Sequence, residues 1–153
     1  MKIGLISDTH GQLRARVLEL FDGVDVILHA GDIGDLNLIT ELEALAPVHA
    51  VHGNTDDAEI ATRYGESVEL QLDGVRIAMT HGHLLGAPTA PGLRRMFPGA
   101  DVIVYGHTHM QRIDRGQPLL VNPGAAGPAR FKLKPAVAIL ELPTLNVTQF
   151  PLT

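Results

Sequence analysis

The sequence has no cysteine and no tryptophan, and aromatic residues make up only 4% of its 153 residues. Without cysteine there can be no disulfide, no thiolate metal ligand and no cysteine nucleophile, so a metal could be held only by nitrogen and oxygen atoms. The shortage of aromatic side chains leaves little surface on which single-stranded nucleic acid could stack. The chain carries 17 acidic and 12 basic residues, and this negative balance argues against binding of long nucleic acid.

Long apolar segments are also missing. No run approaches the roughly 20 apolar residues that a membrane-spanning helix needs, and the opening residues MKIGLISDTHG become polar too early for a signal peptide. We therefore expect a cytoplasmic protein with no membrane partner. Because 45% of the residues are hydrophobic, we expect residues 1–153 to form one domain with a core of its own. The sequence leaves homo-oligomerisation open.

One pattern recurs five times, in which a short apolar run rich in Val and Ile is followed directly by Asp, His, Asn and Gly. The polar clusters begin DTHG, GDIGD, HGNTD, HGH and GHTH, and the runs before them are Lys2–Ser7, Val24–Ala30, Val48–Val51, Val75–Thr80 and Asp101–Tyr105. Runs of this length and composition are typical of strands buried on both faces. Ligands bind beyond the carboxyl ends of the strands in open parallel sheets, so we expect the five clusters to meet at one edge.

The spacing of apolar residues predicts helices over Leu13–Phe21 and Leu38–Leu45, with Asp35 placed to cap the second. Strands that alternate with helices indicate an α/β fold with a largely parallel sheet. After Tyr105 the pattern changes to that of hairpins, which predicts a second, mostly antiparallel sheet packed on the first. The expected hairpin strands are Arg112–Asp114 with Leu119–Val121 and Ala136–Leu142 with Asn146–Leu152, and a short helix is expected around Leu93–Phe97.

The polar clusters supply imidazole, carboxylate and amide groups that suit Mn, Fe, Ni or Zn in a site without sulfur. Seven such ligands are too many for one ion but fit two: Asp8, His10, Asp32, Asn54, His81, His107 and His109. Asp32, in the middle of the set, is the candidate to bridge the two ions. Glycines beside the ligands would let the backbone approach the ions closely; they are Gly31, Gly53, Gly82 and Gly106. His29 and His49 lie inside apolar runs, and we interpret them as structural.

Two ions about 3.5–4 Å apart can acidify a shared water, so we expect a metal-bridging hydroxide to attack a phosphate ester. Two divalent ions bring four positive charges, and the carboxylates of Asp8 and Asp32 cancel two of them. The hydroxide lowers the remaining charge to about +1. A phosphodiester monoanion would neutralise this site, whereas a monoester dianion would leave it negative. The charge balance therefore favours small phosphodiesters as substrates.

At this point the residues resemble a known family. DTH, GDIGD, GNTD, HGH and GHTH resemble the five motifs of the calcineurin-like metallophosphoesterases, and the short chain resembles their compact bacterial and archaeal phosphodiesterase branch. The resemblance extends from Met1 to about Arg130 and implies an αββα sandwich of two mixed sheets flanked by helices. It also implies a hydrolase that acts on small phosphate esters with two divalent ions, Mn foremost. One ion would be held by Asp8, His10, Asp32 and His109, and the other by Asp32, Asn54, His81 and His107.

The resemblance also suggests residues that act beside the metal ligands. Asp35 matches the last carboxylate of the GDxxD motif, which supports the ligands from behind. Asn122-Pro123-Gly124 matches an NPG segment of the compact branch, and Arg130 falls near the place of a phosphate-facing arginine, although a plain surface role is the alternative. The expected catalytic set is Asn54, His81, Asp35 and His83, and His83 enters it only as a candidate acid.

One position departs from the family pattern. Many members have a histidine directly after the Asn of the GN motif, where it protonates the leaving group, and here that position is Thr55. Threonine is a poor general acid. His83, His52 or a water would have to supply the proton.

Two other functions must be weighed. A binding scaffold on the same fold, like the retromer subunit that resembles this family but has a degraded metal site, is the main alternative. All seven ligand positions are filled here, which favours an enzyme. A nuclease for large nucleic acids is disfavoured by the acidic balance of the chain.

Overall fold

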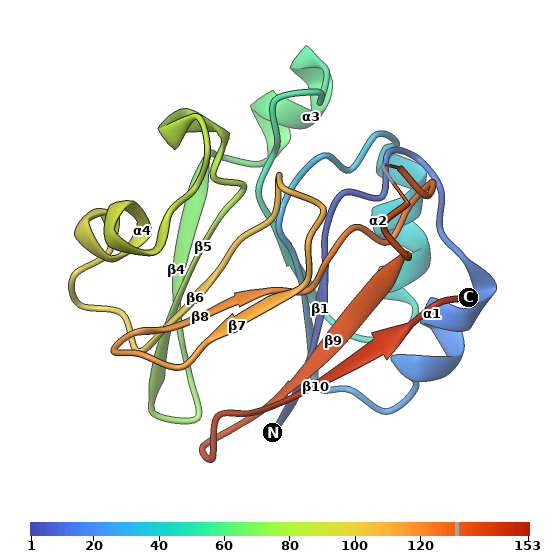
Figure 1. Ribbon diagram of the computed structural model, residues 1–153. Coiled ribbons are helices and arrows are strands. Elements are labelled where there is room, and N and C mark those ends of the chain that lie inside the picture. Colours follow the sequence, from blue (N-terminus) through green and yellow to red (C-terminus); the bar gives the residue numbers. More distant parts are fainter. Residues whose placement is uncertain (131) are drawn as a thin grey trace.

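Two five-stranded sheets form the centre of the structure, a computed structural model that describes residues 1–130 and 132–153 (Figure 1). The first sheet contains β1 (Lys2–Ile6), β2 (Val26–His29), β3 (Val48–Ala50), β9 (Ala136–Glu141) and β10 (Asn146–Pro151). Its strands lie in the order β10-β9-β1-β2-β3. β1, β2 and β3 are parallel, and β9 runs antiparallel to both β1 and β10.

The second sheet contains β4 (Ser67–Leu72), β5 (Val75–Thr80), β6 (Val102–Val104), β7 (Arg112–Asp114) and β8 (Leu119–Asn122). Its strands lie in the order β4-β5-β6-β8-β7. β5, β6 and β8 are parallel, and the two edge strands are antiparallel to their neighbours. Two mixed sheets are thus present, as predicted.

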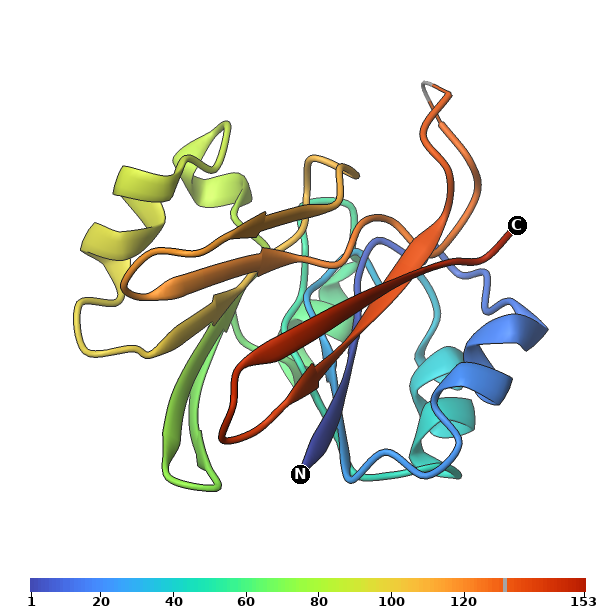
Figure 2. The same cartoon turned by 60° about the horizontal axis from the view of Figure 1, so that its bottom comes forward.

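The strands divide between the sheets differently from our expectation. β5 and β6 belong to the second sheet, and the last hairpin, β9 with β10, extends the first sheet by pairing with β1. Figure 2 shows this hairpin lying along β1, far from it in sequence. An apolar run reveals that a strand is buried but not which strand it pairs with, because pairing depends on residues distant in the chain.

Within residues 1–130 and 132–153, four α-helices and one 3₁₀ turn accompany the sheets: α1 (Ala15–Leu20), α2 (Leu36–Glu43), α3 (Ala58–Arg63), η1 (His83–Leu85) and α4 (Ala90–Met96). α1 and α2 lie on the side of the first sheet, and α4 lies on the opposite side of the molecule, beside the second (Figures 1 and 2). The side chain of Asp35 caps α2, because it accepts a hydrogen bond from Asn37 N at 2.9 Å. This confirms the predicted start of that helix.

The sequence interpretation missed α3 and β4. β4 reads SVELQL, an alternation of polar and apolar residues that is typical of a strand with one face exposed. It forms a hairpin with β5 through Asp73-Gly74, both with positive φ (50° and 76°). This turn chemistry could have revealed the hairpin.

Apolar side chains fill three layers. The layer between the sheets includes Leu5, Leu28, Ile77 and Val104. A second layer joins the first sheet to α1 and α2 through residues such as Val17, Phe21, Ile27 and Leu42, and a third joins the second sheet to α4 through Leu93, Phe97 and Ile103. The order helix, sheet, sheet, helix is the predicted αββα sandwich.

The loops that follow β1, β2, β3, β5 and β6 gather at one end of the sandwich, opposite the N-terminus (Figure 1). In the part of the chain that the structure describes, none of the helices has the length and apolar character needed to cross a bilayer.

Candidate metal centre

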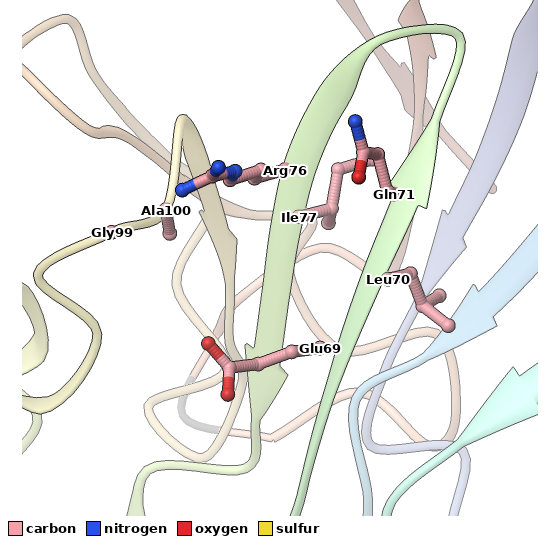
Figure 3. A pocket seen from close by; sticks show the side chains of 7 residues that line it. All are labelled: Glu69, Leu70, Gln71, Arg76, Ile77, Gly99 and Ala100. Atoms are coloured by element: carbon pink, nitrogen blue, oxygen red, sulfur yellow. The ribbon is translucent and has the colours of Figure 1, made fainter.

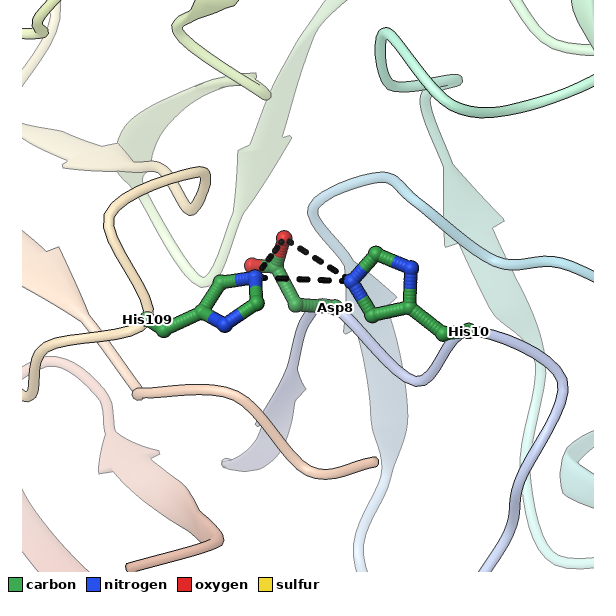
Figure 4. Close-up of side chains that lie close together, drawn as sticks. All are labelled: Asp8, His10 and His109. Carbon is green, nitrogen blue, oxygen red and sulfur yellow. Dashed lines mark hydrogen bonds and ion pairs between the residues drawn. The ribbon is translucent and has the colours of Figure 1, made fainter. Parts of the chain in front are cut away.

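Three of the predicted ligands point their metal-binding atoms at one another. Asp8 Oδ1 lies 3.3 Å from His109 Nε2 and 4.0 Å from His10 Nε2. The two histidine nitrogens are 3.4 Å apart. Figure 4 shows that Asp8 and His10, from the loop after β1, and His109, from the loop after β6, converge on one point. A single cation could be held there by one carboxylate oxygen and two imidazole nitrogens.

A second group lies directly beside the first. His81 Nε2 is 3.2 Å from Asp32 Oδ2, 3.7 Å from Asp8 Oδ1 and 3.1 Å from Asn54 Oδ1. Asp32 Oδ2 is also 3.9 Å from His10 Nε2, so this oxygen faces both groups. That position suits a bridging ligand. Asp8 Oδ1 faces both groups as well, although the family resemblance gives it to one ion alone.

His107 is placed differently from the other predicted ligands. Its ring lies edge-on to that of His81, with the ring centroids 5.2 Å apart. It lines the same cleft as Asn54 and His10 but belongs to neither of the two compact groups.

The carboxylates leave one oxygen each for a cation. Asp8 is fully buried, and its Oδ2 accepts hydrogen bonds from Ser7 Oγ at 2.6 Å and from His107 N at 3.1 Å. Its Oδ1 has no hydrogen-bond partner among the described residues. Asp32 Oδ1 likewise accepts from Thr55 N at 2.9 Å, while Oδ2 faces the histidines. A buried carboxylate oxygen without a partner is costly unless a cation neutralises it.

The orientation of His81 also fits a metal ligand. Its Nδ1 donates to Ala30 O at 2.8 Å, which leaves the lone pair of Nε2 directed at the carboxylates. Metal-bound histidines commonly use their second nitrogen in this way. The side chains of the two groups thus match, in type and orientation, the donors that divalent metal ions prefer.

The electrostatics of the centre favour positive charge. Burial alone would lower the pKa of His81, but the hydrogen bond to Asp32 and the charges of Asp8 and Asp32 raise it. Burial would raise the pKa of Asp32, yet His81 and the hydrogen bonds from Thr55 hold it far below its usual range. Burial lowers the pKa of both His10 and His107, which keeps these rings neutral and able to bind metal.

The backbone is strained at the ligands. Five of the seven have positive φ, between 47° and 73°: Asp8, His10, Asp32, His107 and His109. Non-glycine residues adopt this conformation rarely, and it concentrates at functional sites. Hydrogen bonds between the loops hold it in place, among them Asp8 N to Gly31 O at 2.9 Å and His10 N to Asp32 O at 3.0 Å.

The glycines beside the ligands lie where a side chain would collide with a predicted ligand or where φ is positive. At Gly53 a Cβ atom would collide with Asp32, and at Gly106 it would collide with Ser7 and Asp8. Gly31 and Gly82 have φ near 100°. These positions allow the loops to pass against the ligands without a side chain in between.

The contacts that fix the Asp32 and Asn54 loops come from a residue that sequence reasoning missed. Asp56 accepts hydrogen bonds from Ile33 N at 3.1 Å, Gly34 N at 2.9 Å and Gly53 N at 2.8 Å. Asp35, to which we had assigned the supporting role, is exposed, and the only hydrogen bond that its side chain makes among the described residues is the helix cap. The carboxylate of the GNTD turn was the available signal for Asp56.

Hydrogen bonds from Asn122 hold the loop that carries His107 and His109. Its Nδ2 donates to Gly106 O at 3.2 Å and to Thr108 Oγ1 at 2.9 Å, and its Oδ1 accepts from Gly124 N. Asn122 is fully buried. These contacts give the NPG segment a physical role.

His29 is structural, as interpreted. It is fully buried, and burial lowers its pKa to about 4, so the ring is neutral. Its Nδ1 accepts from Gly31 N, and the opposite nitrogen lies 3.0 Å from Thr9 Oγ1, whose hydroxyl donates to Ile33 O. This chain of hydrogen bonds ties the first two polar loops together. His49 is half-buried on β3.

A cleft of about 200 Å³ opens over the ligands. Arg130 and Thr55 line it together with His10, Asp32, Asn54, His107, Thr108 and His109. A larger hollow of about 260 Å³ lies on the second sheet between Glu69, Arg76 and Ala100, and its lining contains no histidine (Figure 3). The side chains that could bind a metal therefore line the smaller cleft and not the larger hollow.

His83 and His52 lie beside the metal ligands. The His83 ring is 5.5 Å from that of His81 and 6.2 Å from that of His52. Its Nδ1 is buried without a hydrogen-bond partner among the described residues. His52 Nδ1 donates to Tyr64 O at 2.7 Å.

Overlapping groups of carboxylate and imidazole ligands at the carboxyl ends of two sandwiched sheets define a metal-dependent hydrolase. Comparison with known proteins agrees with this class. Residues 1–144 match the calcineurin-like phosphoesterase superfamily domain. The chain belongs to that superfamily, as its motifs indicated.

Two curated relatives cover most of the chain. A probable metallophosphoesterase of Methanothermobacter thermautotrophicus is 35% identical, over 93% of this chain and 86% of its own. The phosphodiesterase YfcE of Escherichia coli K12 is also 35% identical, over 82% of this chain and 79% of its own.

Two solved structures have the same fold. A novel archaeal phosphodiesterase superposes with a TM-score of 0.79 at 27% identity and covers 99% of both chains. Zinc-bound Vps29 of Entamoeba histolytica superposes with a TM-score of 0.79 at 20% identity and covers both chains completely. This second likeness concerns the fold alone.

Proposed function

We propose that this protein hydrolyses small phosphodiesters with two divalent metal ions, with Mn²⁺ as the first candidate and Ni, Fe or Zn as alternatives. The observation that carries the proposal is the buried, unpartnered Oδ1 of Asp8, which faces the Nε2 atoms of His10, His81 and His109. When bound, the ions would activate a water and stabilise negative charge on the phosphoryl oxygens. The relatives named as phosphodiesterases support the same reaction.

The predicted ligands keep their roles in this proposal. Asp8, His10 and His109 would hold one ion, and Asn54, His81 and His107 the other. Asp32 would contact both, since its Oδ2 lies between His81 and His10. In this proposal Asp35 only caps α2, and Asp56 supports the loops that carry Asp32 and Asn54.

Arg130 would bind the phosphate group from the open side of the cleft. It is exposed, it lines the cleft, and its charge contributes to the lowered pKa of His10. A guanidinium can hold two phosphoryl oxygens at once. Together with the charge balance of the ligands, this favours a small anionic ester.

We expect the Mn²⁺-loaded protein to hydrolyse bis(4-nitrophenyl) phosphate with a kcat/KM about tenfold above that for 4-nitrophenyl phosphate, a difference of about 1.4 kcal/mol in transition-state binding. Release of nitrophenol would be followed by absorbance. Protein treated with a chelator is the control and should be inactive. No turnover with Mn²⁺, Ni²⁺, Fe²⁺ or Zn²⁺ would instead favour the non-catalytic scaffold.

Thr55 is a poor general acid, and His83 is our candidate for the residue that protonates the leaving group in its place. It lies next to His81 and His107, with ring centroids 5.5 and 6.4 Å away. We expect His83→Ala to slow esters of alkyl alcohols by about 10²-fold, because alkoxides need a proton to leave, and 4-nitrophenyl esters only slightly. His49→Ala, on β3 and outside the cleft, is the matched control. An equal loss with both leaving groups would eliminate His83 as the acid.

A further inference from the structure

A small hollow of about 90 Å³ adjoins the metal cleft. Its lining consists of Pro88, Tyr105, Thr108, Met110, Gln111 and Arg112. Thr108 also lines the metal cleft and stands between the ligands His107 and His109. A molecule bound in the cleft could therefore extend into this hollow.

The lining combines flat, apolar and cationic groups. Met110 is 57% exposed, so its thioether is accessible to a ligand, while Tyr105 is buried. The Arg112 side chain is 66% exposed, and its guanidinium reaches Asp114 only at 3.9 Å, so it remains free to contact a ligand. The thioether of Met makes favourable contacts with aromatic rings, and the guanidinium of Arg packs against their faces.

Hydrogen bonds connect the wall of the hollow to the loop that carries the predicted metal ligands. Thr108 Oγ1 accepts hydrogen bonds from Met110 N at 3.2 Å and from the buried Asn122 at 2.9 Å. Arg112 on β7 pairs with Asn122 on β8. One residue, Asn122, thus positions both the loop that carries His107 and His109 and the wall of the hollow.

The size of the hollow limits what it can hold. About 90 Å³ equals roughly three water molecules at ~30 Å³ each. That is room for one ring but not for a row of bases. A small ester with a single ring beside its phosphate fits both spaces.

We propose that this ring subsite, formed by Pro88, Tyr105, Met110, Gln111 and Arg112, binds the planar ring of the substrate while its phosphate lies in the metal cleft. The inference rests on the proposed function and narrows the substrates to small phosphodiesters that carry a single aryl ring or a pyrimidine base. Gln111 offers an amide that could hydrogen-bond the edge of a nucleobase.

The test is a binding measurement on the Mn²⁺-loaded full chain, with phenylphosphonate and methylphosphonate as probes in titration calorimetry. We expect phenylphosphonate to bind about tenfold more tightly, as stacking of one ring allows. Met110→Ala and Arg112→Ala should each bring the ratio to about twofold or less. Leu84→Ala is the matched control, since Leu84 is 53% exposed and lines neither space. It should leave the ratio unchanged.

A second pair of probes separates the two kinds of ring. If the natural ring is a nucleobase, uridine 5′-monophosphate should bind more tightly than ribose 5-phosphate, because its single pyrimidine ring fits the hollow, and Gln111→Ala should reduce only this preference. If it is an aryl group, the phenyl preference alone should appear. Equal binding of the ring-bearing and ringless probes, or no binding of either, would overturn the subsite. Ring preference without turnover would leave the subsite standing and refute the hydrolytic function, whereas turnover without ring preference would do the reverse.

Discussion

Asp32→Asn is expected to reduce phosphodiester turnover by about 10³-fold or more while the fold stays intact. Asp32 Oδ2 faces His81 Nε2 at 3.2 Å and His10 Nε2 at 3.9 Å, so it is the one oxygen of this residue available to both metal groups. An amide nitrogen in its place cannot bind a cation and would donate to His81 instead. The loss of several kcal/mol of charge stabilisation corresponds to a rate factor of this size.

The fold should survive this change because the other oxygen is retained. Asp32 Oδ1 accepts the hydrogen bond from Thr55 N at 2.9 Å, and the carbonyl oxygen of Asn can accept it equally well. Turnover, bound metal per chain and thermal unfolding should be measured together. Metal content should fall below that of the natural protein while the unfolding temperature of the metal-free forms stays similar.

Asp25→Asn is the matched control for Asp32→Asn. Asp25 precedes β2 and accepts from Lys2 N at the amino end of the sheet, whereas Asp32 follows the same strand at its carboxyl end. The two substitutions remove the same charge from opposite ends of one strand. Activity loss in both variants, or in neither, would show that Asp32 does not act through the metals.

Asp56→Ala is expected to destabilise the protein by about 2–3 kcal/mol and to weaken metal binding by about 10–100-fold. The half-buried carboxylate accepts hydrogen bonds from Ile33, Gly34 and Gly53 and so ties together the two loops that carry Asp32 and Asn54. Its removal leaves three backbone N–H groups without their acceptor. Hydrogen bonds to a charged acceptor are among the stronger ones in proteins.

The neighbouring residue provides the control for Asp56→Ala. Asp57 Oδ1 accepts from Ile60 N and caps α3, so Asp57→Ala should cost only about 1 kcal/mol and leave metal affinity unchanged. Urea unfolding of the metal-free proteins would give the stabilities, and calorimetric titration with Mn²⁺ the affinities. Equal metal affinity in the two variants would contradict the role of Asp56 in holding the centre.

Strain at the ligands gives these supports their importance. The positive φ of Asp8, Asp32 and His107 is unfavourable in a free chain and is maintained by hydrogen bonds between loops. Asp56, Asn122 and His29 each join two such loops or hold one in place. The candidate metal centre thus combines predicted ligands with a strained backbone and residues with ordinary backbone conformations that hold their loops.

The sequence predicted the parts of the fold that depend on local pattern. The five strands before the polar clusters lie where their Val- and Ile-rich runs placed them, and α2 begins at the predicted cap, Asp35. The sequence also predicted the types of the metal-binding side chains and their order along the chain, because each polar cluster directly follows a strand. β4 was not predicted because continuous apolar runs identify strands buried on both faces. In β4, polar and apolar residues alternate and one face is exposed.

By itself, the sequence determined which segments are strands, which side chains can bind a metal, and that these side chains follow the strands. Only the tertiary structure decided that β5 and β6 lie in a different sheet from β1 and that Asp56 and not Asp35 supports the loops. It also decided that Asp8 Oδ1 has no hydrogen-bond partner among the described residues. The ring subsite beside Thr108 likewise appears only when distant segments are brought together. The physical reason is the same in each case. Neighbouring residues determine whether a segment is buried and which turn it forms, whereas residues far apart in the chain determine strand partners and side-chain contacts.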